Sequence, residues 1–600
     1  MKKIKTSLTQ LRKNNIKIPG PISKTIGAFS RTEKTIFYIL TIMFVVSGII
    51  LLFRVNQNFL VKIPMHGGMI TEGVTGIPQI INPVTINPFT SPEADNDLIA
   101  LVYSGLMKAT PDGALIPDLA KSYNLTEGGL VYTFVLKDDL VWHDGEPVTS
   151  EDVKFTIQKA QDPEIGSRHK ASWDGVLVET PDNKTVVFTL NEPYSPFLQN
   201  TTLGILPKHL WKNVHPESFT HDQLNTKPIG TGPYKIIDIK KDSNDIVEYY
   251  DLKSFDEYSL GEPYIDKIRI QFYTNKTELI DAYEKGKVTN IHSISPNKAK
   301  EFEETYRIER AKLPRIFGAF FNQNEAVIFT NQTVREALNI ATDRDDIINS
   351  IFYGFATEIY GPIPPGSIGY LPNEDKDESE EAVGTTTLSN IEIAKNLLED
   401  DGWTTDDDGV LNKKIKGSAE RLEFSISTTQ APELIAVAQK LKESWEKLGA
   451  KVEIKSFATT NDLENHAIRP RKYDILLFGE IIRRDSDPFA FWHSSQRLDP
   501  GLNIASYTNI TVDKALEQAR ATTSIEARLE QYEIFQEEIK NDIPAVFIYS
   551  PEFIYLSRNE IMGLKLNIIN TPSERFLNVH EWFMKTERVW KIFTEGKEIL

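Results

Sequence analysis

The most continuous hydrophobic stretch in the chain runs from Thr35 to Phe53 and is bracketed by Lys34 and Arg54. Its nineteen residues carry no charge. At about 1.5 Å per residue in a helix they reach about 28 Å, which is close to the hydrocarbon thickness of a bilayer. This pattern predicts a transmembrane helix over residues 35–53.

The residues before this stretch are polar and strongly basic. Residues 1–34 contain nine Lys and Arg against a single acid, Glu33, and the positive-inside rule keeps such a short segment in the cytosol. We therefore expect a cytosolic basic tail at 1–34, a single crossing of the cell membrane, and an extracytoplasmic remainder. The alternative is a cleaved secretory signal, which usually has a shorter apolar core followed by small residues. The sequence Arg54-Val55-Asn56-Gln57 after the stretch favours a retained anchor.

After the anchor, the pattern alternates between strand and helix periods. Residues 131–136 and 185–190 are rich in β-branched and aromatic residues and lie between turn formers, which is typical of strands. Between them, Thr149 with Asp152, or Ser150 alone, is expected to cap a helix.

The second half of the chain shows the same alternation. Thr333 is expected to cap a helix with one apolar face. Residues 432–448 predict an amphipathic helix whose buried side includes Ile435, and residues 451–455 and 474–478 predict strands. Because helices and strands alternate, we expect an α/β lobe here.

Composition narrows the functional classes. The chain has a net charge of −18, and because residues 1–34 carry +8, the remainder carries −26. Such an acidic remainder argues against a nucleic-acid role. The absence of cysteine excludes disulfides and lipid attachment through a cysteine. About 545 residues after the anchor are too many for one core and predict two to four structural units.

Seven groups of short motifs follow one another along the chain. They are Tyr103 to Ile157; Ile205 to Leu210; Pro228 to Lys235; Val334 to Leu338 with Asp343-Arg344; Ala394 to Leu398 with Gly402-Trp403; Tyr473-Asp474 with Asp487-Pro488; and Asn503 to Tyr507. In this order they resemble the family 5 extracellular solute-binding proteins, the oligopeptide, dipeptide and nickel receptors of ABC importers. The resemblance covers about residues 68 to 585.

The resemblance implies a periplasmic-binding-protein-like α/β fold of two lobes and an extra subdomain, three units in all, with the ligand cleft between the lobes. Two connecting segments, near residues 317 and 550, would form the hinge. The expected parts are lobe I at 65–98, 228–317 and 551–585, subdomain II at 99–227, and lobe II at 318–550.

Other candidate chemistry in the sequence has simpler explanations. Gly230-Thr231-Gly232-Pro233 lacks the third glycine of a dinucleotide loop and predicts a tight crossing between lobes that only glycine fits. His209, His215 and His221 do not match common zinc spacings. Residues 406–409 lack the first and last ligands of a calcium loop and predict a solvated turn. We find no catalytic or nucleotide-binding motif, and we expect no catalytic residues, metal or cofactor.

The candidate ligand site lies between Phe478 and Trp492. In peptide-binding members of the resembled family, an aspartate shortly before a D-P or E-P pair captures the amino terminus of the peptide, and the preceding strand pairs with the peptide backbone. On that basis Phe478, Gly479, Glu480, Asp485 and Trp492 are the expected ligand-binding residues.

This chain departs from the family pattern at two positions. The aspartate of the family stands four residues before the proline, where this chain has Arg484, whereas Asp485 stands three before it. A tryptophan commonly follows the glycine, and here that residue is Glu480. Either Asp485 or Glu480 supplies the carboxylate, or the ligand has a different charge pattern; Asp485 could also be a surface or loop-capping residue, and Trp492 a core residue.

The expected function is capture of an extracytoplasmic peptide and its delivery to an ABC permease with ATPase subunits on separate chains, with the receptor itself a monomer. Alternatives are a receptor for another small solute, such as a sugar or a metal chelate, and a surface sensor or enzyme on the same scaffold.

Overall fold

The computed structural model describes residues 29–86, 92–372, 389–415, 417–482, 487–522 and 524–594. The chain divides into two compact units, one of Met1–Met65 with Lys585–Leu600 and one of His66–Met584. Each unit is organised around its own elements. The predicted tail at 1–34 lies outside the described residues up to residue 28.

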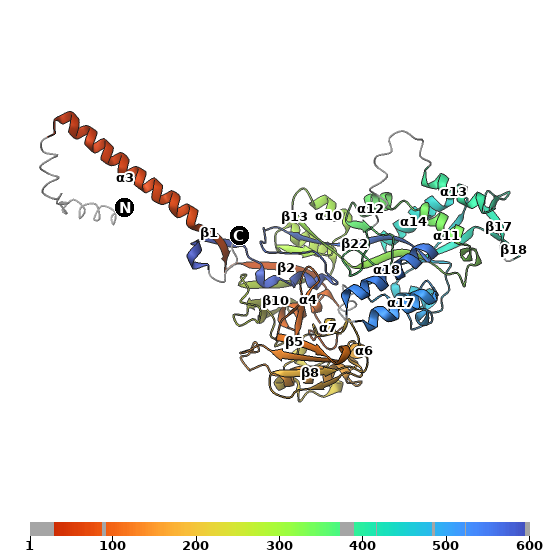
Figure 1. Cartoon of the computed structure of the whole chain (residues 1–600), viewed down its shortest axis with the longest axis horizontal. Coiled ribbons are helices and arrows are strands. Elements are labelled where there is room, and N and C mark those ends of the chain that lie inside the picture. Colours follow the sequence, from red (N-terminus) through yellow and green to blue (C-terminus); the bar gives the residue numbers. More distant parts are fainter. Residues whose placement is uncertain are drawn as a thin grey trace. The chain divides into compact units, whose positions relative to one another are not determined.

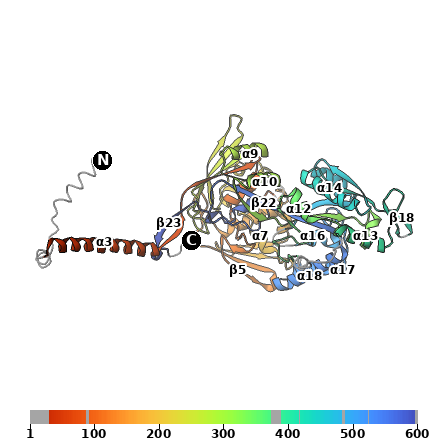
Figure 2. The same cartoon turned by 90° about the horizontal axis from the view of Figure 1, so that it is seen from above.

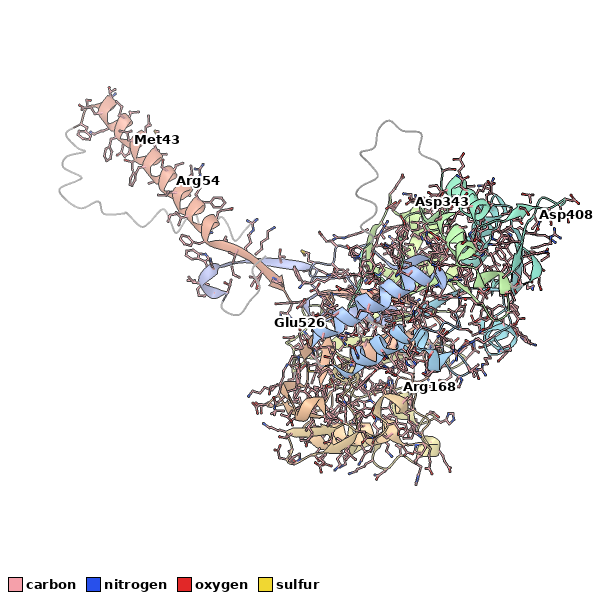
Figure 3. All side chains as sticks on the ribbon, turned by 45° about the vertical axis from the view of Figure 1, so that its right-hand side comes forward. Met43, Arg54, Arg168, Asp343, Asp408 and Glu526 are labelled. Carbon is pink, nitrogen blue, oxygen red and sulfur yellow. The ribbon has the colours of Figure 1, made fainter. Side chains whose placement is uncertain are left out.

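The first unit is built on one long helix, α3 (Arg31–Phe59). It starts at Ser30, whose side chain forms a capping box with Glu33, so the helix extends beyond both ends of the predicted 35–53. Within Arg31–Gln57 no residue of the most apolar window is buried, and the helix is long and apolar enough to cross a membrane. Figure 3 shows the side chains of Met43 and Arg54 projecting from an uncovered helix.

A two-stranded ribbon completes the first unit. Strand β1 (Leu60–Met65) follows α3 directly, and β23 (Lys585–Trp590) pairs antiparallel with it from Leu60↔Trp590 to Met65↔Lys585. The chain therefore returns, near its end, to the point where α3 stops.

The second unit contains a twelve-stranded sheet that runs through two lobes. The order along it is β20-β19-β21-β14-β22-β12-β2-β11-β10-β9, with β13 and β15 also paired to β22. Strand β22 (Ala545–Ser557) pairs with β14 (Arg315–Phe321) through its first half and with β13 (Arg307–Lys312) through its second. One strand thus belongs to both lobes (Figure 1).

The two segments that cross between the lobes touch beside two prolines, Pro551 within β22 and Pro314 between β13 and β14. The Leu313 N–H donates to the Pro551 carbonyl at 3.4 Å, and the Ser550 hydroxyl donates to the Leu313 carbonyl at 2.8 Å. Pro314 separates β13 from β14.

Lobe I holds the other half of the sheet. Its strands are β2 (Met69–Thr75), β9 (Tyr234–Lys241), β10 (Val247–Ser254), β11 (Lys267–Tyr273) and β12 (Asn290–His292), and its helices are α4 (Glu93–Val102), α9 (Lys276–Glu284) and α10 (Pro296–Phe302). Strands β2 and β11 are parallel, whereas β9, β10 and β11 are antiparallel.

A smaller subdomain is packed on lobe I. Its four-stranded antiparallel sheet has the order β5-β6-β8-β7. Its elements are β3 (Met107–Ala109), β4 (Leu115–Pro117), β5 (Ala120–Thr126), β6 (Val131–Leu136), β7 (Leu177–Glu179), β8 (Thr185–Thr189), α5 (Ser150–Gln161), α6 (Lys170–Trp173), α7 (Phe197–Asn200) and α8 (Lys208–Trp211). The predicted strands are confirmed, and so is the Thr149–Asp152 capping box of α5.

Lobe II is the predicted α/β unit. Its strands are β14, β15 (Ala356–Glu358), β16 (Thr404–Thr405), β17 (Leu411–Ile415), β18 (Ser418–Arg421), β19 (Glu423–Thr429), β20 (Lys451–Phe457) and β21 (Ile475–Ile481); its helices are α11 (Gln332–Ile340), α12 (Arg344–Ile351), α13 (Asn390–Asp400), α14 (Pro432–Glu446), α15 (Thr460–Leu463), α16 (Phe489–Trp492), α17 (Ile510–Ala521) and α18 (Ile525–Asp542). Figure 2 shows α9 and α10 over one lobe and α13 and α14 over the other.

Each lobe has its own apolar core. One cluster joins lobe I with the subdomain, and two clusters fill lobe II, one including Trp445 and the other Trp492. Two helix details differ from expectation. Asn331, not Thr333, caps α11, because the Asn331 side chain accepts the Thr333 N–H. On α14 the buried face is Leu434, Val437, Ala438, Leu441 and Trp445, whereas Ile435 is only partly buried.

The predicted glycine crossing is confirmed as a close approach. A Cβ atom on Gly230 would lie 1.9 Å from the Val102 carbonyl oxygen at the end of α4. We expect Gly230→Ala to destabilise the protein by about 3 kcal/mol, because backbone atoms must move apart. Urea unfolding measures this, with Gly361→Ala as the control, since the nearest atom to its added methyl is 4.0 Å away. Equal effects of the two changes would contradict the close-contact explanation.

Candidate functional site

The candidate site is built on strand β21 in the middle of lobe II. Strand β21 is parallel to β19 and antiparallel to β14, with Gly479 opposite Phe317 and Glu480 opposite Ile316. Its carboxyl end, at Ile481, meets the first residue of β14, Arg315. In open α/β sheets, ligands bind outside the carboxyl ends of the parallel strands, so the predicted residues occupy the expected edge.

One edge of the end of β21 is open. Strand β14 pairs with all of Ile475–Ile481, but β19 pairs only with Ile475 and Leu476. Among the described residues, no strand lies along the other edge of residues 478–481. The backbone groups along that edge can therefore pair with an extended ligand, which is how sheets bind peptides irrespective of their side chains.

Gly479 allows an aromatic ring to lie against the strand. A Cβ atom there would lie 2.6 Å from Cε1 of Phe317. The Phe317 ring in turn stacks on Tyr549 of β22, with centroids 4.8 Å apart and planes 5° from parallel. Gly479 thus positions two aromatic rings beside the crossing strands rather than contacting a ligand through a side chain.

Glu480 is a buried carboxyl group without a partner. Only 3% of the residue is exposed, and neither carboxyl oxygen has a hydrogen-bond partner among the described residues. Burial raises the pKa of Glu480 well above its ordinary value. A buried acid of this kind holds a proton until a cation arrives to compensate its charge.

The other predicted residues take different places. Asp485 lies outside the described residues. Phe478 is half-buried on β21. Trp492 is 1% exposed and packs among Phe320, Tyr507, Phe535 and Phe547 in the core of lobe II. The core alternative for Trp492 is therefore the better description of its surroundings.

The carboxylate of Asp487, the aspartate of the D-P pair, already has an ion-pair partner. Asp487 accepts three hydrogen bonds from the Arg520 guanidinium, at 2.6 to 3.0 Å, and the guanidinium also lies 3.9 Å from the centroid of Phe489. This pair ties the start of α16 to the end of α17 and leaves no free carboxylate at Asp487.

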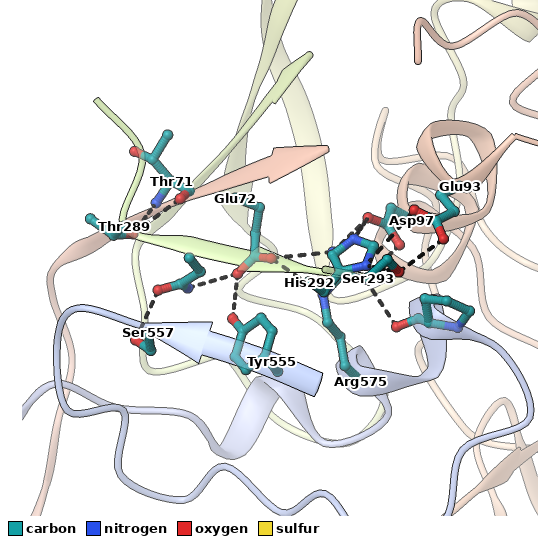
Figure 4. Close-up of polar contacts among 12 residues, drawn as sticks. Thr71, Glu72, Glu93, Asp97, Thr289, His292, Ser293, Tyr555, Ser557 and Arg575 are labelled. Carbon is teal, nitrogen blue, oxygen red and sulfur yellow. Dashed lines mark hydrogen bonds and ion pairs between the residues drawn. The ribbon is translucent and has the colours of Figure 1, made fainter. Parts of the chain in front are cut away.

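A buried polar network fills lobe I on the side of the crossing strands (Figure 4). The Arg575 guanidinium is fully buried and donates to Asp97 of α4 and Glu72 of β2. Glu72 also accepts from Asn290 at 2.7 Å and from the Tyr555 hydroxyl at 2.5 Å. Burial would raise the pKa of Asp97, but Arg575 and His292 outweigh it and hold that pKa below its ordinary value.

The network continues toward lobe II. His292 lies 3.7 Å from Asp97 and 3.8 Å from Glu93, and the Ser293 hydroxyl donates to Glu93 at 3.0 Å. Arg315 is the first residue of β14. Its side chain has no hydrogen bond or ion pair to a described residue, and its Nε is buried. Burial lowers the pKa of Arg315, and the Glu93 carboxylate opposes that shift. The Glu93 carboxylate of α4 therefore acts electrostatically on the Arg315 guanidinium at the start of β14.

A cavity of about 280 Å³ lies between lobe I and the subdomain. Its lining includes Tyr103, Lys108, Asp118 and Gln199, and none of the residues predicted for the ligand site. It is therefore separate from the edge of β21.

The remaining sequence candidates form no metal centre. No cluster of three or more His, Asp or Glu that could hold a metal occurs in the part of the chain that the structure describes. His209 pairs with Asp144 at 2.9 Å. The Asp406 side chain accepts from the Asp408 and Val410 N–H groups and pairs with Arg421, as in an ordinary turn.

Comparison with known families decides the classification. The family model "Bacterial extracellular solute-binding proteins, family 5 Middle" matches residues 114–499, well over half of the chain. The chain belongs to this family. The predicted periplasmic-binding-protein-like α/β fold is confirmed, because solved structures of binding proteins match the chain over most of its length.

Three relatives illustrate the similarity of this family 5 protein. The oligopeptide-binding protein AppA of Bacillus subtilis is 26% identical over 529 residues, which cover 87% of this chain and 92% of AppA. The crystal structure of NikZ from Campylobacter jejuni in complex with Ni(L-His) is 26% identical, with a TM-score of 0.65 over 86% of this chain and 99% of NikZ. The substrate-binding protein CtaP of Listeria monocytogenes is 25% identical, with a TM-score of 0.71 over 86% and 99%.

Sequence reasoning missed two charged residues of this family 5 protein. Glu93 and Arg315 are 222 positions apart in the sequence, and neither belongs to a recognisable motif. Arg315 directly follows Pro314 within a segment expected to cross between the lobes. A basic residue in a crossing segment was a weak signal, because Arg310 and Lys312 of the same segment share it.

Proposed function

We propose that this chain is an extracytoplasmic receptor that binds peptides and delivers them to an ABC permease carried, with its ATPase subunits, on separate chains. The observation that carries the proposal is the open edge of β21 at residues 478–481, which can accept a peptide backbone. The similarity to the oligopeptide-binding protein AppA supports the same ligand class.

The charges beside β21 suit the two ends of a peptide. Arg315, without a partner among the described residues, can bind a carboxylate. Either Glu480 or Asp485 can receive the ammonium group. Phe478, Gly479 and Trp492 then act through the strand and its packing, with Gly479 placing Phe317.

We assign the lobes as 65–98, 228–317 and 551–585 for lobe I, 99–227 for subdomain II and 318–550 for lobe II, with closure about the two crossing strands. The subdomain also touches lobe II away from those strands. The Ser195 N–H donates to the Arg520 carbonyl at 3.2 Å, and Arg528 donates to the Ser195 hydroxyl at 3.1 Å. Such contacts favour a closed arrangement.

Helix α3 is proposed as a retained anchor that holds the receptor near its permease and raises its effective concentration there. Amino-terminal sequencing of the protein purified from membranes tests this. We expect the tail at 1–34 to be intact; a new amino terminus after residue 53 would mean that the helix is a cleaved signal.

Isothermal calorimetry of the full chain in lipid nanodiscs tests the ligand class. We expect heat with mixed tri- to hexapeptides and much weaker binding of the same peptides after N-acetylation, because acetylation removes the ammonium charge. Absence of heat with every peptide would remove the proposal.

A second ligand class has one specific observation in its favour, the similarity to NikZ, whose structure holds Ni(L-His). Such a complex brings its own metal ligands. Binding of nickel with histidine, and not of peptides, in the same calorimetry would select it.

A further inference from the structure

Strand β23 and the residues after it lie beside the end of the apolar helix. Strand β1 continues α3 without a break, β23 returns along it, and the short helix η10 (Lys591–Phe593) follows at once. These elements all belong to the first compact unit. Segments more than 500 positions apart in the sequence therefore meet at the residue where α3 stops.

Four large apolar side chains gather at this meeting point. Phe59 is 53% exposed, Trp590 41%, Ile592 70% and Phe593 70%. The rings of Phe59 and Trp590 are stacked, with centroids 5.9 Å apart and planes 14° from parallel. An exposed apolar group of this size on an otherwise acidic protein needs a partner.

The position along α3 identifies that partner. Phe59 stands six residues after Phe53, the end of the uncharged stretch, which is about 9 Å along a helix. The interfacial layer on each side of the hydrocarbon is about 5 to 8 Å thick, and aromatic side chains are enriched in it. Phe59 and Trp590, whose rings are stacked, therefore stand at the outer boundary of this layer, and Ile592 and Phe593 follow Trp590 by two and three residues.

The charges on the ribbon agree with this assignment. Lys62 and Arg588 are directly opposite in the β1/β23 register and both are exposed. Like charges in this position destabilise a strand pair unless an anion compensates them. Among the described residues no carboxylate forms an ion pair with either side chain, whereas lipid phosphates at this depth would.

We propose that Phe59, Trp590, Ile592 and Phe593 enter the outer leaflet of a phospholipid bilayer and form a second membrane attachment beside α3. The inference rests on the proposed membrane anchor and adds the carboxyl-terminal segment to it. Two attachments joined by the ribbon hold β1 and β23 at the membrane surface, where α3 alone would leave them free to lift away.

The absence of cysteine makes a direct test simple. In the full chain, Phe593→Cys is labelled with an environment-sensitive fluorophore and the protein is reconstituted in phospholipid vesicles. Lipids with a nitroxide near the ester group or near the chain end serve as quenchers. The controls are Val46→Cys within α3 and Asp408→Cys on an exposed turn of lobe II.

We expect the label at 593 to be quenched mainly by the shallow nitroxide, the label at 46 by the deep one, and the label at 408 by neither. Quenching at 46 with none at 593 would overturn the second attachment and leave the anchor intact. Absence of quenching at both 46 and 593 would overturn the anchor itself. Since Phe593 is largely exposed, the substitution should not disturb folding.

Discussion

Replacement of Arg575 by methionine is expected to lower the free energy of unfolding by about 3 to 5 kcal/mol, because it leaves two buried carboxylates without their cation. Glu72 and Asp97 are both fully buried, and Arg575 donates to each of them. Methionine fills a similar volume, so the loss is one of charge compensation rather than of packing. Urea unfolding of the full chain at neutral pH measures the difference.

Arg307→Met provides the matched control. Arg307 also pairs with two acids, Glu309 and Glu560, but half of its side chain is exposed, and such pairs contribute about 1 kcal/mol or less. Equal losses of unfolding free energy in the two variants would show that the buried network stabilises the protein no more than an exposed ion pair does.

The effect of Arg575 should depend on pH in a defined direction. The folded protein holds the pKa of Asp97 below its ordinary value, so the stabilisation is present above the unfolded pKa of about 3.9 and is lost as the pH falls through the folded pKa. The difference between wild type and Arg575→Met is therefore expected to shrink in acid. A difference that grows in acid would contradict this assignment.

Replacement of Glu480 by glutamine should change stability and affinity in opposite directions. A carboxyl with a raised folded pKa keeps its proton when the unfolded chain loses it, so stability falls by up to about 1.4 kcal/mol per pH unit above the unfolded pKa of about 4.3. Burial raises the pKa of Glu480 in this way. Glutamine cannot ionise, so the variant lacks this loss of stability at high pH. We expect the variant to be more stable than wild type at pH 7 to 8 and as stable as wild type near pH 4.

The same variant should bind peptides less tightly if Glu480 receives the ammonium group. Loss of one partner of a buried charge pair costs about 2 kcal/mol or more, which is about 30-fold in Kd. Asp485→Asn is the companion variant. A loss only in Asp485→Asn would assign the amine to Asp485, whereas unchanged affinity in both would remove the amine anchor from this segment.

Local patterns predicted much of the fold, because they depend on near neighbours in sequence. The alternation in residues 131–136 and the capping box at Thr149 specify their elements without help from distant residues. The cap of α11 was misplaced because Asn331 and Thr333 are both good N-caps, and the choice depends on where the preceding turn ends.

The site was less predictable, since its chemistry depends on residues that only the tertiary fold brings together. Gly479 is predicted from the sequence as a site residue. The reason that a glycine is needed there, which is the Phe317 ring lying against it, is visible only when β14 and β21 are paired. Glu480 and Trp492 look equally suited to a pocket in sequence. The tertiary fold separates them: Trp492 is packed in an aromatic core with residues of α17 and α18, whereas Glu480 is buried without a partner among the described residues.

The contact of Leu313 with Pro551 limits how the two lobes can move. One connection is the continuous strand β22, which contains Pro551, and the other passes from β13 to β14 at Pro314. Both prolines lack an N–H and lie at the level of the Leu313–Pro551 hydrogen bond. Sliding would break many hydrogen bonds at once, whereas rotation about a line through Pro314 and Pro551 breaks few. We therefore expect closure to be a rotation about this line, so that the angle between the lobes is what distinguishes the open protein from the ligand-bound one.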